Sequence, residues 1–403
     1  MDLTTGLDDL VAVALVAALA PLVVAMLPGP RIPQVVVFLL GGVLIGPHVL
    51  GFAETSSIQL LANIGLGFLF LLAGYELDPR LLRQEPGRLA IGGWLMSAAI
   101  AVGVAAALTA AGYIKDYVPV GLALTTTALG TLLPILRDNG MLGGEFGRHV
   151  FAAGAVGELF PILIIAVFLG QRGSFVALAS VALVGALALV LTIVPWLARS
   201  AAVQRIVTEG QEATGQVTLR WSMVLLFALL AVASRFGLDV VLGAVLAGMV
   251  LRGWTQHLRM DTASLEHKFD AVGYGLFIPI FFISSGMSFD LKSISEDPLR
   301  LLVFFALLLV VRGLPSLLVY RRALAPVQRV EMTFITATTL PLLIALAAVG
   351  QEDGVMLPAT AASLIGAGVL SVLVFPLIAV GLHRRAALTP ADVGLTAEET
   401  PQA

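Results

Sequence analysis

The 403-residue chain contains no cysteine and carries little charge. The absence of cysteine excludes disulfides and thiol chemistry. Charged residues make up 12% of the chain and apolar residues 59%, with a mean hydropathy of +0.99, whereas soluble domains carry roughly 25% charged residues. The net charge of -3 does not favour a nucleic-acid binder, and HExxH, GxSxG and P-loop motifs are absent, so we expect no enzyme. A chain this apolar cannot cover itself with polar surface, which predicts an integral membrane protein.

Apolar runs bounded by charge, proline or glycine predict about thirteen transmembrane helices, because a helix needs about 20 apolar residues to cross the hydrocarbon core. The acidic N-terminus lacks the basic region of a signal peptide, so we expect the first span to be retained. The predicted spans are residues 8–27, 34–51, 58–77, 88–112, 117–136, 148–169, 174–197, 218–234, 238–253, 271–288, 299–320, 329–349 and 354–382.

Lys and Arg are distributed unevenly between the loops on the two sides of these spans. The side of the N-terminus has five of them and the opposite side has seventeen. Because cytoplasmic loops carry the excess of basic residues, the N-terminus is predicted to lie outside and the C-terminus in the cytoplasm. The remaining basic residue, Arg312, lies deep inside the eleventh predicted span.

Three segments recur later in the chain in the same order, at offsets of 202, 212 and 211 residues. Each copy lies seven predicted spans downstream, so the two copies would cross the membrane in opposite directions. Inverted repeats are typical of secondary transporters, whose substrate sites lie near the midplane at discontinuous helices. The matched segments are Leu40–Gly46 with Leu242–Gly248, Phe70–Asp78 with Phe282–Asp290, and Thr125, Thr127 and Leu129 with Thr336, Thr338 and Leu340.

Two ionisable side chains, Glu158 and Arg312, lie deep within predicted spans. A charge at the bilayer centre costs at least about 2.5–3.5 kcal/mol on insertion scales, so each indicates a function. Counted from the cytoplasmic ends of their spans, they lie at similar depths of roughly 12–15 Å. Their opposite charges predict that they form an ion pair.

Two threonine pairs, each followed by a proline, reach the same depth. A proline removes a backbone donor and frees a carbonyl upstream. Hydroxyls and freed carbonyls, together with the Glu158 carboxylate, can coordinate a monovalent cation. The alternative is that the threonines bond only their own helices and the prolines are simple kinks. The residues are Thr126 and Thr127 with Pro134, and Thr338 and Thr339 with Pro341.

Three motifs resemble those of the second monovalent cation:proton antiporter family, which includes Kef-type potassium/proton and bacterial sodium/proton exchangers. They are GGVLIGPHVLG at 41–51, FLFLLAGYELDP at 68–79 and IPIFFISSGMSFD at 278–290. The resemblance implies an all-α, sodium/proton-antiporter-like fold in which predicted spans five and twelve are crossed and discontinuous. Glu158 then matches the ion-binding position of the family and Arg312 its basic position. Two features differ from the family pattern: Gly157 stands where many members have a polar or acidic residue, and Glu158 replaces Asp.

The same resemblance implies a homodimer whose protomers combine a panel domain with a mobile core. Residues 1–87 and 218–298 would supply the panel and dimerisation helices, and residues 88–169 and 299–382 the core. Residues 170–217 would form a linking helix and a cytoplasmic linker. The tail at 383–403 is predicted to be disordered and is too short for a nucleotide-binding regulatory domain.

These observations predict a secondary transporter of a bacterial-type inner membrane that exchanges Na⁺ or K⁺ for protons without a cofactor. Glu158 would carry either a proton or a transient cation, so elevator-type alternating access would be electroneutral. Two alternatives stay open. One is a proton-coupled exporter of an organic ion on the same fold, for which Gly157 would make room. The other is a channel, which needs a continuous polar stripe, whereas the sequence shows only a local polar cluster.

Overall fold

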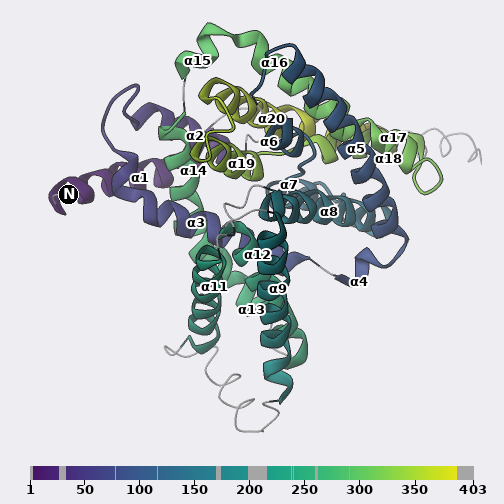
Figure 1. The fold of residues 1–403 in the computed structure, drawn as a ribbon, viewed down its shortest axis with the longest axis horizontal. Helices are drawn as coiled ribbons and strands as arrows, with labels where there is room; N and C mark the ends of the chain where they lie inside the picture. The colour runs from purple at the N-terminus through teal and green to yellow at the C-terminus, as the bar shows by residue number, and fades with distance from the viewer. Residues whose placement is uncertain are drawn as a thin grey trace, which may run out of the picture. The chain divides into compact units, whose positions relative to one another are not determined.

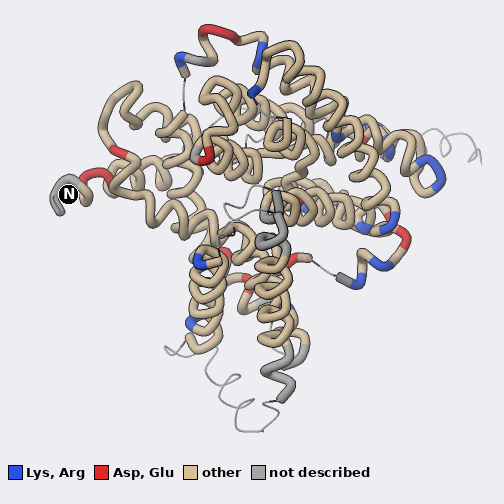
Figure 2. Tube along the Cα trace, in the orientation of Figure 1, with Lys and Arg blue, Asp and Glu red and all other residues tan. Residues whose placement is uncertain are grey.

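The computed structural model of the chain is helical, with no strand among the residues that it describes. Nine helices in this part of the chain are long and apolar enough to cross a membrane, and three shorter apolar helices accompany them. Lys, Arg, Asp and Glu residues lie mostly at helix ends and connections, with long stretches of uncharged residues between them (Figure 2). The exact number of thirteen spans stays a prediction. The described residues are 3–26, 33–77, 79–115, 117–168, 174–197, 216–236, 238, 240–258, 262–289 and 291–387.

The chain divides into two compact units, each assembled from two separate stretches of sequence. The first unit comprises Met1–Pro79 and Leu159–Ser295, and the second comprises Arg80–Glu158 and Glu296–Ala403. The roles of panel and mobile core remain predictions for these parts of the chain. Residues 198–215 and 388–403, which hold most of the predicted linker and tail, lie outside the described residues.

The first unit consists of helices that pack through close backbone contacts. Its elements are α1 (Leu3–Met26), α2 (Gln34–Ile45), α3 (Thr55–Glu76), α9 (Ser174–Leu197), α11 (Val217–Arg235), α12 (Val240–Leu258), α13 (Thr262–Val272), the π-helical η1 (Gly273–Phe277), α14 (Ile278–Met287) and α15 (Leu291–Glu296), which ends just past its boundary (Figure 1). The helix around the tenth predicted span begins at Thr262 rather than at residue 271, because Leu265 and Phe269, one turn apart, are both buried.

Glycines allow two helix pairs of this unit to touch backbone to backbone. Helix α2 packs on α14, and α3 packs on α12. A Cβ atom at Gly42 of α2 would lie 2.0 Å from the carbonyl oxygen of Ile283, and one at Gly248 of α12 would lie 2.1 Å from that of Leu71. Helices α2 and α12 carry the first of the three pairs of repeated segments, and α3 and α14 carry the second. The repeated segments therefore form the same kind of contact twice, once between α2 and α14 and once between α12 and α3.

The second unit contains the residues that the sequence singles out as a site. Its elements are α4 (Pro79–Leu82), α5 (Glu85–Ala110), α6 (Tyr117–Ala123), α7 (Leu129–Asp138), α8 (Gly144–Phe168) as far as Glu158, α16 (Pro298–Leu307), the π-helical η2 (Leu308–Gly313), α17 (Pro315–Val319), α18 (Pro326–Ala337), α19 (Pro341–Glu352) and α20 (Pro358–Ala387) (Figure 1).

Helix α20 continues to Ala387, past residue 383, where the tail was expected to begin. Two contacts explain the extension. The His383 ring lies 3.3 Å from a carboxylate oxygen of the buried Glu331 on α18, and Arg384 donates a hydrogen bond to the side chain of Asn139. The last turns of α20 are therefore anchored within the second unit.

We expect His383→Ala to lower the thermal stability of the protein. Glu331 is 1% exposed and would lose its side-chain partner, and a buried group left without its hydrogen bond costs about 1–3 kcal/mol. Thermal unfolding in detergent would measure the loss. Adding Glu331→Gln should recover part of the lost stability, because the amide carries no charge. A double variant as unstable as the sum of the two single variants would contradict this explanation.

Candidate functional site

The first discontinuous helix of the second unit ends and restarts around residues 124–128. Helix α6 ends at Ala123, and α7 begins at Leu129. The hydroxyls of Thr125 and Thr126 donate to the carbonyls of Leu122 and Ala123, at 2.8 and 2.7 Å. Such local side-chain bonds offer the backbone an alternative to the helical pattern. They account for a break at this point.

The second discontinuous helix breaks at residues 338–340, between α18 and α19. Pro341 is the first residue of α19 and has no amide hydrogen, so it begins a helix without leaving a donor unpaired. The Thr338 hydroxyl donates to the carbonyl of Phe334, 2.9 Å away. Pro341 therefore marks the break as predicted. The first break lies upstream of Pro134, which is inside α7, and this corrects the position expected from that proline.

The two breaks bond directly to each other. The hydroxyl oxygens of Thr126 and Thr339 lie 2.7 Å apart. The Ala128 amide donates to the Thr338 carbonyl at 2.9 Å, and the Thr127 hydroxyl donates to the Thr336 carbonyl at 2.7 Å. The four threonines predicted for the site are all buried. The predicted pair of discontinuous helices is thereby confirmed.

Glu158 on α8 meets the first break. Its side chain accepts a hydrogen bond at Oε1 from the amide of Leu129, 2.8 Å away, which is the first residue of α7. The positive end of a helix dipole stabilises a carboxylate in this position. The residue is only 7% exposed, and its other oxygen, Oε2, is buried and accepts no hydrogen bond from the described residues. The carboxylate thus keeps one buried oxygen available for a ligand.

Arg312 lies in the π-helical stretch η2 and is 3% exposed. Its Nε atom donates to the Thr127 hydroxyl at 2.9 Å, and its Nη2 atom donates to the Ala153 carbonyl at 3.0 Å. No ion pair joins Arg312 to Glu158 among the described residues. The predicted direct pair is therefore not formed in this structure. Thr127 lies between the two charges instead, because its hydroxyl accepts from Arg312 and its amide donates to the carbonyl of Gly157.

Gly157 is part of this contact. A Cβ atom there would lie 2.6 Å from the Thr127 hydroxyl oxygen and 2.7 Å from Nη2 of Arg312. Real Cβ atoms do not approach neighbours so closely, so the guanidinium fills the space that a side chain at residue 157 would take. The room expected beside Glu158 for a larger solute is therefore already occupied at this position.

Sequence reasoning overlooked Ser371 on α20. Its hydroxyl contacts both the amide and the carbonyl of Thr339 at the second break. The offset of 213 residues that separates Glu158 from Ser371 also separates Thr126 from Thr339, which meet in the structure but are not paired by the repeated segments of the sequence.

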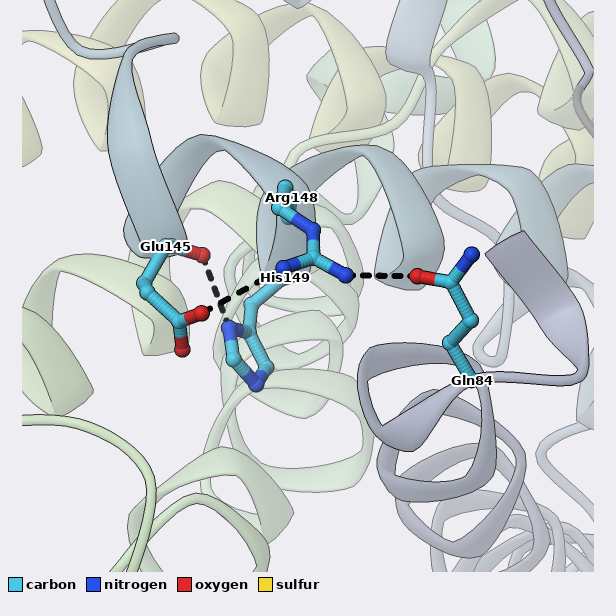
Figure 3. A network of polar contacts seen from close by, with 4 residues as sticks. All are labelled: Gln84, Glu145, Arg148 and His149. Atoms are coloured by element: carbon cyan, nitrogen blue, oxygen red, sulfur yellow. Dashed lines mark hydrogen bonds and ion pairs between the residues drawn. The ribbon is translucent and has the colours of Figure 1, made fainter.

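The start of α8 is tied to α5 by a polar network (Figure 3). Arg148 pairs with Glu145 at 3.3 Å and donates to the side chain of Gln84, the residue that precedes α5. The Nδ1 atom of His149 is hydrogen-bonded to the backbone carbonyl of Glu145, and the His149 ring lies edge-on to the ring of Tyr320. The helix that carries Glu158 is thus fixed near its beginning.

Comparison with known proteins gives a consistent picture. The model of the family described as "Sodium/hydrogen exchanger, transmembrane" matches residues 12–382. YjbQ of Bacillus subtilis is 25% identical over 94% of this chain and 64% of its own length. The glutathione-regulated potassium-efflux system protein KefC of Salmonella paratyphi B is 26% identical over 77% of this chain and 50% of its own length. The chain thus spans between half and two thirds of these two relatives.

A solved structure shares the fold. The sodium proton antiporter MjNhaP1 from Methanocaldococcus jannaschii at pH 8 superposes with a TM-score of 0.67, covering 94% of this chain and 96% of its own. Only 18% of the residues are identical. The likeness therefore establishes the antiporter-type fold predicted from the sequence.

Proposed function

The chain belongs to the sodium/hydrogen exchanger family, and we propose that it exchanges a monovalent cation, Na⁺ or K⁺, for protons across a membrane. The observation that carries the proposal is the buried Oε2 atom of Glu158, which accepts no hydrogen bond from the described residues. A deeply buried carboxylate has a high desolvation cost, so its presence within a transmembrane segment indicates a functional role. Binding either a proton or a cation at this oxygen would neutralise it.

The neighbouring breaks supply further oxygens for a cation. When the Thr126 hydroxyl donates its hydrogen bond to the Ala123 carbonyl, the Thr339 hydroxyl donates to Thr126 in their shared bond. Both hydroxyl oxygens keep lone pairs. Hydroxyl and carbonyl oxygens are suitable ligands for a cation that has lost part of its hydration shell. We propose Glu158, Thr126, Thr127, Thr338 and Thr339 as the site that accepts the cation.

Arg312 would act through Thr127 rather than by pairing with the carboxylate. Its guanidinium is held by the Thr127 hydroxyl and the Ala153 carbonyl. A fixed positive charge close to the breaks offsets the charge of an empty Glu158 and disfavours a second cation. One titratable carrier that binds either ion would make the exchange one-for-one and electroneutral.

We further propose that the second unit acts as the mobile core of an elevator-type cycle, in a homodimer of a bacterial-type inner membrane. The N-terminus would lie outside and the C-terminus in the cytoplasm, as the distribution of Lys and Arg predicts. An organic ion as the exported solute is less well supported, because Arg312 and Thr127 fill the space at Gly157.

Flux measurements in proteoliposomes would test this proposal. With an imposed pH gradient reported by a quenched dye, adding Na⁺ or K⁺ should restore fluorescence by driving protons across the membrane. Li⁺ is tested in parallel, and each addition is repeated at an imposed membrane potential. An electroneutral exchanger should give the same rate with and without the potential, because one charge moves in each direction.

Three outcomes would contradict the proposal in different ways. No response to any of the three cations would reject cation:proton exchange and favour an organic solute. A rate that changes steeply with the potential would reject the one-for-one stoichiometry but leave exchange intact. Rates that fail to saturate with cation concentration would indicate a channel.

A further inference from the structure

Ser371 lies on α20 with its hydroxyl against the second break. The residue is fully buried. Its Oγ atom accepts a hydrogen bond from the Thr339 amide at 3.1 Å. The same atom lies 2.8 Å from the Thr339 carbonyl oxygen and 2.7 Å from the carbonyl oxygen of Gly368, one turn earlier in its own helix.

These three contacts exceed what one hydroxyl can make at the same time. A serine hydroxyl has one proton to donate and lone pairs to accept. It can accept from the Thr339 amide throughout, but it can donate only to Thr339 or to Gly368 at any moment. The two carbonyl oxygens lie at nearly equal distances. The hydroxyl therefore has two alternative positions of its proton.

The proton position decides whether the Thr339 carbonyl is engaged. Among the described residues, Ser371 is the only donor to that carbonyl. Gly368 permits the approach, since a Cβ atom there would lie 3.0 Å from the Thr339 carbonyl oxygen. When the hydroxyl donates to Gly368, the carbonyl at the break is free to coordinate a cation. Its amide stays bound to Ser371, so the break keeps its shape.

Glu158 and Ser371 have parallel roles at the two breaks. Each lies on a helix that packs against a discontinuous helix, and each accepts a hydrogen bond from a backbone amide beside a break. In both cases a glycine of this helix faces the helix that follows the break: Gly154 faces Leu129 of α7, and Gly368 faces Leu343 of α19. One break thus has a charged acceptor beside it, and the other has a neutral hydroxyl that can rotate.

We propose that Ser371 is a positioning residue of the transport site, whose hydroxyl turns from Thr339 to Gly368 and so presents the Thr339 carbonyl to the cation. The inference rests on the proposed cation exchange for its ligand. Its structural part, that Ser371 holds the second break, does not depend on transport.

The test compares Ser371→Ala, Ser371→Thr and Ser363→Ala in full-length protein. Ser363 is a matched control, because it is buried on α20 but its hydroxyl bonds only its own helix, at Ala359. Proton flux driven by Na⁺ and by K⁺ gives KM and kcat. Hydrogen–deuterium exchange at the Thr339 amide, without cation, reports on the break itself.

For Ser371→Ala we expect a KM about fivefold higher, because the Thr339 amide loses the hydrogen bond that keeps the break and its carbonyl in position, with a much smaller change in kcat. Exchange at the Thr339 amide should become faster. Ser371→Thr should have the wild-type KM and the wild-type exchange rate at the Thr339 amide, because it keeps the hydroxyl. Ser363→Ala should match the wild type in both measurements.

The proposal fails if Ser371→Ala leaves KM unchanged or lowers it, or if kcat alone falls. Unchanged exchange at the Thr339 amide would reject the structural part as well. If the wild-type protein moves no cation, the proposed function fails and the role of the carbonyl as a cation ligand fails with it. Faster amide exchange in Ser371→Ala would then still show that Ser371 holds the break.

Discussion

Glu158→Gln is expected to reduce cation-driven proton flux to the level of protein-free vesicles. Glutamine can neither bind and release a proton nor supply negative charge to a cation. Oε2 of Glu158 is a buried oxygen that accepts no hydrogen bond from the described residues. In glutamine, an amide nitrogen would replace one of the two carboxylate oxygens. The flux assay with Na⁺ and K⁺ measures the result directly.

The same variant should fold, because the contact that Glu158 makes in the structure survives the substitution. The carbonyl oxygen of glutamine can still accept the hydrogen bond from Leu129, which Glu158 now accepts at 2.8 Å. Removing a buried charge also removes its desolvation cost. We therefore expect a thermal midpoint in detergent at least as high as that of the wild type.

Glu331→Gln provides a matched control for this prediction. Glu331 is another buried carboxylate of the second unit, but it pairs with His383 and has no contact with the breaks. It should retain cation-driven flux. Normal exchange by Glu158→Gln would show that Glu158 has a structural role only. Loss of flux in both variants would show that the assay reports general damage to the unit.

The sequence singles out most of the residues proposed for this site, because charged side chains are rare in long apolar helices. Glu158 and Arg312 stand out in spans whose other charged residues, Arg148 and Arg300, lie at the span ends. The repeat connects Thr127 with Thr338, two residues whose neighbours meet across the breaks in the structure. The all-α antiporter-type fold followed from the same patterns and the motifs.

The contacts of Arg312 could not be predicted in the same way. Counting residues along a helix gives depth, but it does not show toward which neighbour a long side chain turns. Similar depth and opposite charge suggested a pair with Glu158. In the structure the guanidinium bonds Thr127 and the Ala153 carbonyl instead.

The position of the first break was missed for a related reason. Proline was expected to mark it, but Thr125 and Thr126 end α6 by bonding its last carbonyls. Amides at the end of the break and at the start of α7 then donate hydrogen bonds to Gly157, Thr338 and Glu158, which are distant in sequence. Such tertiary partners leave no local pattern, and Ser371 was overlooked for the same reason.

Gly157→Ala should have a large effect for a single added methyl group, because it crowds the contact between Thr127 and Arg312. The new Cβ atom would lie within 2.7 Å of both Thr127 and the Arg312 guanidinium. Either Arg312 gives up the Ala153 carbonyl, or α8 moves away from the first break. Overpacking of this kind costs about 1–3 kcal/mol. We expect a lower thermal midpoint and a severe loss of cation-driven flux, because the displaced guanidinium no longer holds Thr127.

Gly92→Ala separates crowding from the general effect of replacing glycine in a helix. Gly92 lies within α5, and a Cβ atom there would meet nothing within 4 Å. Alanine at an open helical position is favoured over glycine by about 1 kcal/mol, so this variant should match or exceed the wild type in stability and keep its flux. The two substitutions are chemically identical and are expected to act in opposite directions. Wild-type flux and stability in Gly157→Ala would show that Arg312 can leave Thr127 and Ala153 without consequence, and its proposed electrostatic role at the site would then be wrong.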